Sequence, residues 1–265
     1  MWWIALSGAV LIGLSLGLLG SGGSILTVPV LVYLVGEPDK VAIAESLGIV
    51  AAIAAAGALP YARQQAIDWR SVLFFGIPGI IGTYGGAWLS RFVSGPVQLV
   101  LFAGVMLLAA ILMYRGRRPG ASPLTPAASS VVAAPPHAAW KIMLEGISVG
   151  VLTGLVGVGG GFLIVPALVL LGGLDMRRAV GTSLVIIALK SVAGYLKYLD
   201  VLASMGLAVN WKLVGLFAAV GIAGSFVGNW IGARIPQQRL QRGFAIFLIL
   251  MGLWILYQNL SVLTG

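Results

Sequence analysis

The chain has 265 residues, of which 60% are hydrophobic and 9% are charged, and its mean hydropathy is +1.06. Soluble proteins carry roughly 25% charged residues, so the composition excludes a soluble globular domain and indicates an all-α polytopic membrane protein. Long apolar runs without alternation favour helices over a β-barrel. The net charge of +9 lies mostly in short loops, which indicates membrane orientation and no nucleic-acid partner.

The first apolar run, residues 2–36, is too long for one straight crossing. As a continuous helix it would measure about 50 Å, against a hydrocarbon core of about 30 Å. Glycine destabilises a helix by about 1 kcal/mol relative to alanine, and a glycine cluster occupies Gly20 to Ser24. We predict a break at this cluster, a loop at residues 37–40, and transmembrane helices at about residues 41–61, 71–91 and 96–114.

Residues 115–139 differ from the rest of the chain, because they contain five prolines and three arginines. This composition predicts a flexible linker between a first membrane repeat, residues 1–114, and a second, residues 140–265. In the second half we predict a broken segment at residues 142–173 around the cluster Gly157 to Gly161. A charged loop at residues 175–178 and helices at about residues 179–198, 211–231 and 240–257 follow.

The two halves align without gaps at an offset of 137 residues between the pairs Gly17/Gly154 and Pro60/Lys197. After a five-residue insertion the offset becomes 142, and Trp69 then falls on Trp211. Positions related by an offset of 137 residues up to Tyr61/Tyr198, or of 142 residues from Asp68/Asn210 onward, are called repeat mates below. Other identical mates include Gly20/Gly157, Gly22/Gly159, Gly23/Gly160, Pro29/Pro166, Gly36/Gly173, Ser46/Ser183, Gly82/Gly224 and Trp88/Trp230.

The distribution of basic residues predicts that the two repeats are inverted. If each broken segment crossed the membrane once, the basic residues would divide eight against seven, with no bias. If each segment instead enters and returns on one side, eleven lie on one face and four on the other, which is a positive-inside pattern. The eleven are Arg63, Arg70, Arg115, Arg117, Arg118, Lys141, Arg177, Arg178, Arg234, Arg239 and Arg242, and the four are Lys40, Arg91, Lys197 and Lys212.

This count places the linker in the cytoplasm and both termini outside, and it leaves two arrangements of each broken segment open. One is a re-entrant hairpin and the other is a pair of short full crossings. The second limbs, residues 25–36 and 162–173, would be only about 18 Å long as helices, which favours re-entry. Two glycine tips would then meet near the midplane, as in secondary transporters.

The glycine tips are candidate substrate-binding segments, because helix N-termini with exposed N–H groups suit anions and glycine permits close approach. The alternative is that these glycines only allow tight helix packing. The candidate residues of the two tips are Gly20, Ser21, Gly22, Gly23, Ser24, Gly157, Val158, Gly159, Gly160 and Gly161.

Lys190 is a second kind of candidate, since a lysine near the middle of a predicted transmembrane helix is costly unless it serves a function. It either faces an anion or pairs internally with Glu45. Ser46, Thr182 and Ser183 could hydrogen-bond an oxyanion or only satisfy helix carbonyls. Glu45 is a candidate proton-coupling or ion-coupling group if buried, and otherwise an interface residue.

The paired motif G-x-x-G-x-G-G-x-x-x-x-V-P, present as GLLGSGGSILTVP and GLVGVGGGFLIVP, together with AVGTSL at Ala179 to Leu184, resembles the TauE/SafE sulfite exporter family, also called the toluenesulfonate uptake permease family. The resemblance covers nearly the whole chain apart from the linker. It implies a secondary transporter of sulfite, thiosulfate or organosulfonates in the cytoplasmic membrane. The first half departs from the pattern with AESL at Ala44 to Leu47.

Two other classes of function compete with this interpretation. An anion channel would need an open wet path through the bundle. A membrane-embedded enzyme would need a constellation of histidine and carboxylates, and the single histidine lies in the linker. We therefore expect no catalytic residue, no metal site and no cofactor, with the lipid bilayer and a small sulfur oxyanion as partners. The oligomeric state is left open.

Overall fold

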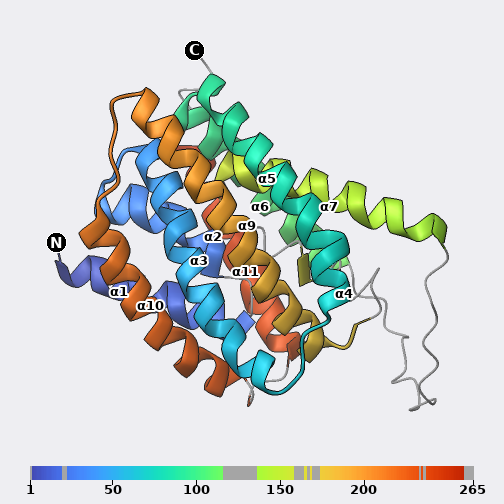
Figure 1. Ribbon diagram of the computed structural model, residues 1–265. Helices are drawn as coiled ribbons and strands as arrows, with labels where there is room; N and C mark the ends of the chain where they lie inside the picture. Colours follow the sequence, from blue (N-terminus) through green and yellow to red (C-terminus); the bar gives the residue numbers. More distant parts are fainter. Residues whose placement is uncertain are drawn as a thin grey trace, which may run out of the picture.

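A computed structural model of the chain describes residues 2–19, 23–115, 136–157, 174–232 and 237–259, together with residues 164, 165, 168 and 234. Apart from turns and short loops, these residues are helical (Figure 1). The first half contains α1 (Trp2–Leu19), α2 (Gly23–Pro29), the π-helix η1 (Val30–Val35), α3 (Asp39–Arg63), α4 (Trp69–Ser71), the π-helix η2 (Val72–Gly76), α5 (Ile77–Leu89), the 3₁₀-helix η3 (Ser90–Phe92) and α6 (Gly95–Arg115). The second contains α7 (Pro136–Val156), α9 (Met176–Ser204), α10 (Trp211–Gly232) and α11 (Gln237–Gln258).

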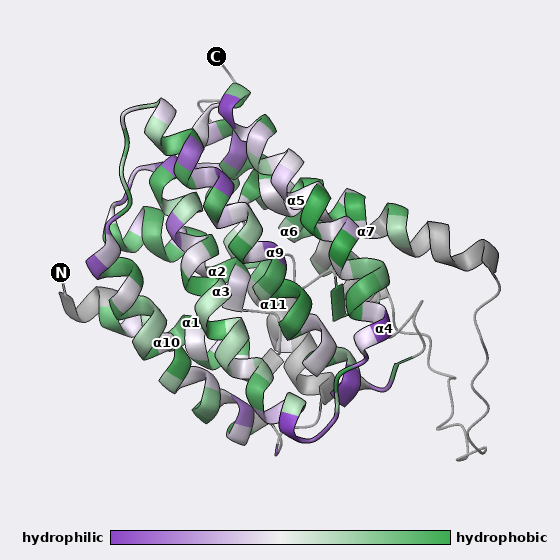
Figure 2. Cartoon of the chain, in the orientation of Figure 1, coloured by the Kyte–Doolittle hydropathy of each residue, from purple (hydrophilic) through white to green (hydrophobic). Residues whose placement is uncertain are grey.

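Four helical stretches are long and apolar enough to cross a membrane: Asp39–Arg63, Trp69–Phe92, Arg177–Ser204 and Trp211–Ile231. Shorter apolar helices stand beside them. Large apolar side chains also cover the outside of the bundle, including Ile81, which is 65% exposed. In Figure 2 hydrophilic residues gather toward the helix ends while the helix bodies are hydrophobic. This distribution confirms a polytopic membrane protein, because lipid replaces water around the helix bodies.

The predicted helices are confirmed, most of them to within a few residues. Three bounds differ: α3 begins at Asp39 within the predicted loop, α7 begins at Pro136 within the predicted linker, and α9 ends at Ser204, six residues beyond the predicted end. One predicted loop is wrong. The stretch Asp175 to Arg178 is not a loop, because α9 begins at Met176 and Asp175 is its N-cap. The Asp175 carboxylate accepts hydrogen bonds from the backbone N–H groups of Arg177 and Arg178 at 3.1 and 3.2 Å. An aspartate at this position satisfies the free N–H groups of the first helical turn, so the charged stretch starts a helix.

The central pair of helices, α3 and α9, shows that the repeats are inverted. A β-carbon added to Gly194 would lie 3.2 Å from Leu47, and one added to Gly57 would lie 3.7 Å from Leu184. Leu184 and Gly194 are the repeat mates of Leu47 and Gly57. Because Leu47 meets Gly194 while the later Gly57 meets the earlier Leu184, residue numbers rise along α3 as they fall along α9. The mates α3 and α9 are therefore antiparallel, and a pseudo-twofold axis passes between them. This confirms the prediction of inverted repeats.

The outer helices interlock the two halves through close glycine contacts. Along α1 and α10, β-carbons added to Gly13 and Gly17 would collide with the backbone at Gly221 and Ser225. The repeat mates of these pairs form the seam between α7 and α5, where Gly150 and Gly154 meet Gly79 and Thr83 in the same way. Such small residues allow helix backbones to approach closely. Each half thus packs its broken helix against the other half.

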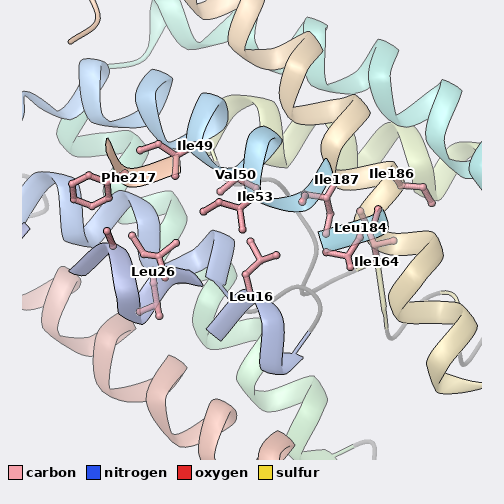
Figure 3. Close-up of a cluster of buried hydrophobic side chains, with 14 of the residues drawn as sticks. Leu16, Leu26, Ile49, Val50, Ile53, Ile164, Leu184, Ile186, Ile187 and Phe217 are labelled. Carbon is pink, nitrogen blue, oxygen red and sulfur yellow. The ribbon is translucent and has the colours of Figure 1, made fainter. Parts of the chain in front are cut away.

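A hydrophobic cluster joins the halves at the centre of the molecule (Figure 3). Leu16 at the end of α1 and Ile53 of α3 lie in its middle. Side chains of α2, α3 and α10 lie on one side, and those of α9 with Ile164 lie on the other. The cluster therefore contains described residues of both broken segments, Leu16 and Leu26 of the first and Ile164 of the second.

Candidate functional site

The first broken segment turns back on itself. The chain leaves α1 after Leu19 and re-enters a helix at Gly23. A β-carbon added to Gly23 would lie 2.5 Å from Leu16 Cβ, and one added to Gly8 would lie 2.5 Å from Val30 Cγ1. The second limb therefore runs antiparallel to α1, and every residue of α2 is buried. Of the predicted tip residues, Gly23 and Ser24 belong to this buried limb, whereas Gly20, Ser21 and Gly22 lie outside the described residues.

The second broken segment begins at Gly157, where α7 ends. Gly157 has a φ of +74°, and its N–H donates to the carbonyl of Thr153 at 2.9 Å. A β-carbon at this position would collide with the side chain of Ile43 on α3. Left-handed backbone and close approach together explain glycine here. The other predicted tip residues, Val158, Gly159, Gly160 and Gly161, lie outside the described part of the chain.

Side chains from three helices bind the carbonyl groups at the end of α7. The hydroxyl of Ser46 on α3 donates to the carbonyl of Gly157 at 2.6 Å and to that of Ile43 at 2.7 Å. The carbonyl of Leu155 accepts hydrogen bonds from Gln98 Nε2 on α6 at 2.6 Å and from the Tyr198 hydroxyl on α9 at 3.0 Å. These bonds satisfy carbonyls that a helix end leaves free. The structure thus joins two predicted site residues, Ser46 and Gly157.

Sequence reasoning missed Gln98 and Tyr198, although a signal existed for both. Each is a buried polar side chain in an otherwise apolar helix, and such residues need partners. Tyr198 is also the repeat mate of Tyr61, whose hydroxyl bonds Asn229 Oδ1 at 3.2 Å.

A crevice lies next to the first break, beside the paired side chains of Tyr61 and Asn229. Apart from these two residues and Ser225, its walls are apolar or formed by glycine. It is lined by Leu16, Gly17, Gly57, Pro60, Tyr61, Leu184, Ser225, Phe226 and Asn229. The crevice is therefore framed by a tyrosine hydroxyl and an asparagine amide from opposite halves.

Glu45 and Thr182 are repeat mates that make equivalent contacts. The N–H of Asn210 donates to Glu45 Oε1 at 2.8 Å, and the N–H of Asp68 donates to Thr182 Oγ1 at 2.9 Å. Asn210 and Asp68 are themselves repeat mates, placed just before α10 and α4. Each central helix therefore anchors the start of a helix in the opposite half. The neighbouring Ser183 donates to the carbonyl of Val180 at 2.8 Å, so its hydroxyl satisfies its own helix.

Lys190 lies in the middle of α9 and is 1% exposed. A β-carbon added to Gly79 of α5 would lie 3.0 Å from Lys190 Cδ and 3.3 Å from Cε, so the lysine stem crosses the glycine seam of α5. Its Nζ has no hydrogen-bond partner among the described residues. Among the described residues, Lys190 therefore forms neither an ion pair with Glu45 nor a hydrogen bond to Gly157. Its repeat mate, Ile53, packs on Gly221 in the equivalent place.

The candidate site is therefore a set of buried polar groups between inverted repeats, each with a broken helix. No group of three or more His, Asp or Glu side chains that could hold a metal occurs in the described part of the chain. Inverted repeats with interrupted helices are the architecture of secondary transporters. The fold and the site together define a membrane transporter.

The chain belongs to the family described as Sulfite exporter TauE/SafE, which it matches over residues 5–255. It is 31% identical over 258 residues to a "Probable membrane transporter protein" of Xylella fastidiosa, covering 96% of this chain and 95% of the relative. It is 30% identical over 277 residues to "Probable membrane transporter protein YunE" of Bacillus subtilis, covering 95% and 97%. No solved structure matches the chain.

Proposed function

We propose that the protein is a secondary transporter of small sulfur-containing oxyanions, namely sulfite, thiosulfate or an organosulfonate, in the cytoplasmic membrane. The substrate class is supported by the family description, Sulfite exporter TauE/SafE. A substrate-binding site near the middle of the membrane is supported by the two helix breaks and by the inverted arrangement of α3 and α9. The excess of arginine and lysine on one face supports a cytoplasmic linker and external termini.

The observation that best supports an anionic substrate is the buried ammonium group of Lys190, which has no hydrogen-bond partner among the described residues. A buried ammonium group without a partner is costly in a membrane protein, and the transported anion would supply the missing charge and hydrogen bonds. Ser24 at the first break would contribute a polar group, together with backbone N–H groups of the glycine tips. Ser46 would act indirectly, because its hydroxyl hydrogen is donated to the carbonyl groups at the second break. Hydrogen bonds to charged groups contribute about 1.5–3 kcal/mol each, so losing Lys190 should weaken the binding of every anionic substrate.

Lys190→Ile is the sharpest substitution, because isoleucine already occupies the equivalent position against Gly221. We expect this variant to keep its helical circular dichroism spectrum. Its affinity for sulfite, thiosulfate and a sulfonate should fall by at least about tenfold, equivalent to about 1.4 kcal/mol. Binding is measured as ligand-dependent thermal stabilisation of the purified protein. Counterflow of labelled thiosulfate in proteoliposomes distinguishes a carrier from a channel. Unlabelled substrate on the opposite side of the membrane accelerates the uptake of labelled substrate by a carrier but not by a channel.

Lys197→Met is the matched control, since it removes a positive charge from the same helix at a residue paired with Asp200 at 3.3 Å. This control should bind anions like the unaltered protein. Equal affinity of Lys190→Ile and the unaltered protein for all three anions would remove Lys190 from the site. Absence of anion binding and counterflow in the unaltered protein would contradict the proposed substrate class.

A further inference from the structure

Glu45 is fully buried in the second turn of α3, next to Asn210 just before α10. Its Oε1 accepts a hydrogen bond from the N–H of Asn210. The Asn210 side chain in turn caps α10, because Oδ1 accepts from the N–H of Leu213 at 3.3 Å. A carboxylate near a helix N-terminus is stabilised by the helix dipole. One oxygen of Glu45 therefore has a clear structural role.

The second oxygen of Glu45 has no such role. Oε2 is buried and has no hydrogen-bond partner in the described part of the chain. The repeat mate Thr182 makes the equivalent bond to Asp68 with a single hydroxyl oxygen, so anchoring the opposite helix does not require a carboxylate. A buried polar atom without a partner is costly. The carboxylate is thus an addition to the shared scaffold, present in one half only.

Tyr195 on α9 places a second unpartnered group at the same junction. A β-carbon added to Gly48, one turn beyond Glu45 on α3, would lie 3.1 Å from Tyr195 Cζ. The Tyr195 ring also packs edge-on against Trp211, the first residue of α10, with ring centroids 6.0 Å apart. Its buried hydroxyl has no partner among the residues described. The repeat mate of Tyr195 is Ala58, so this hydroxyl too is found in one half only.

The charged groups around this junction do not neutralise Glu45. Glu37, which precedes α3, is a like charge that interacts with Glu45. The ammonium group of Lys40 is directed elsewhere, because it donates to the carbonyls of Ser90 and Val93. Lys212 at the start of α10 is exposed. Tyr195 contributes only a neutral hydroxyl group from α9. Among the described residues, no cation is therefore paired with the Glu45 carboxylate.

We infer that Glu45 Oε2, beside the Tyr195 hydroxyl, is the site that binds the proton coupled to anion transport; this inference rests on the proposed function. Proton binding turns the carboxylate into a neutral carboxyl group, while Oε1 still accepts from Asn210. The change occurs at the N-terminus of α10, the helix whose Ser225 packs against Gly17 at the end of α1. The protonation state of Glu45 thus acts on the helix that supports the first break.

The experiment compares uptake of labelled thiosulfate into proteoliposomes with and without a pH difference of one unit. One coupled proton per anion allows at most about tenfold accumulation from this gradient. In the unaltered protein we expect a gradient-dependent rise of several-fold. In Glu45→Gln, which keeps the acceptor oxygen for Asn210, the ratio of uptake with and without the gradient should fall to one. Glu45→Thr, which copies Thr182, should also give a ratio of one. Glu37→Gln is the control and should keep the full response to the gradient.

A full gradient response in Glu45→Gln would overturn the inference, and so would a ratio of one in the unaltered protein. A separate readout covers the case in which the unaltered protein moves no thiosulfate and the proposed function fails. Infrared spectra over a pH titration should then contain the carbonyl band of a protonated buried carboxyl group, and Glu45→Gln should lack it. The same band in both proteins, or in neither, would overturn the proton site.

Discussion

Gly157 connects backbone geometry to the architecture of the second break. Its positive φ ends α7, and its carbonyl is bound by Ser46. Ile43 closes the space beside it, so a side chain at this position would force Ile43 to shift. A single residue therefore sets both the end of a helix and its contact with the central helix α3.

Gly157→Ala should destabilise the protein through two effects, and Gly206→Ala should isolate one of them. Gly206 also has a positive φ, of +69°, but a β-carbon there would meet nothing within 4 Å. Backbone strain alone costs roughly 1–2 kcal/mol, and overpacking against Ile43 adds about 1–3 kcal/mol. Thermal unfolding in detergent should therefore place Gly157→Ala well below Gly206→Ala. Equal unfolding temperatures would contradict the close packing of Gly157 on Ile43.

At the scale of single residues, the sequence predicts which residues contribute to the site better than it predicts the hydrogen-bond partners of those residues. Gly157 belongs to the predicted glycine tip and Ser46 is a predicted polar candidate near the start of its helix, and the structure joins them. The binding of the Leu155 carbonyl by Gln98 and Tyr198 was not predictable. It depends on how α6 and α9 cross α7, and a single-sequence pattern carries no information on such crossings.

The glycine seams hold the elements together. In the seam of α5 and α7, glycine carries no side chain that would keep the backbones apart. The repeated spacing of these glycines was visible in the sequence, and two identical mates, Gly82 and Gly224, fall within the seams. Which helix each glycine row would contact was not visible, because each row packs on the opposite half.

Adjacent glycines on α5 provide a test of this seam. A β-carbon on Gly86 would collide with the carbonyl of Val151 on α7, whereas one on Gly85 would meet nothing within 4 Å. Gly85→Ala should therefore leave stability unchanged or raise it by up to about 1 kcal/mol through helix propensity. Gly86→Ala should lower it by about 1–3 kcal/mol through overpacking. The measurement is the thermal unfolding midpoint, and a Gly86→Ala protein as stable as Gly85→Ala would contradict the seam.

The whole molecule is organised by the inversion of its halves. The gapless duplication predicted two similar repeats, and the arginine and lysine count predicted their inversion. The antiparallel contact of α3 with α9 confirms it. The asymmetries were harder to interpret from sequence, because Glu45 and Lys190 occupy positions whose mates, Thr182 and Ile53, make similar contacts with different chemistry.

Single-cysteine labelling tests the inversion most directly, and the native chain contains no cysteine to interfere. Gln64→Cys follows α3 and Met205→Cys follows α9, and both positions are exposed. Inverted repeats place these loops on opposite faces of the membrane, with the Gln64 loop on the cytoplasmic side. A membrane-impermeant maleimide added to intact cells should therefore label Met205→Cys, and it should label Gln64→Cys only after the membrane is opened. Labelling of both positions from the same side would contradict inverted repeats and the midplane site built on them.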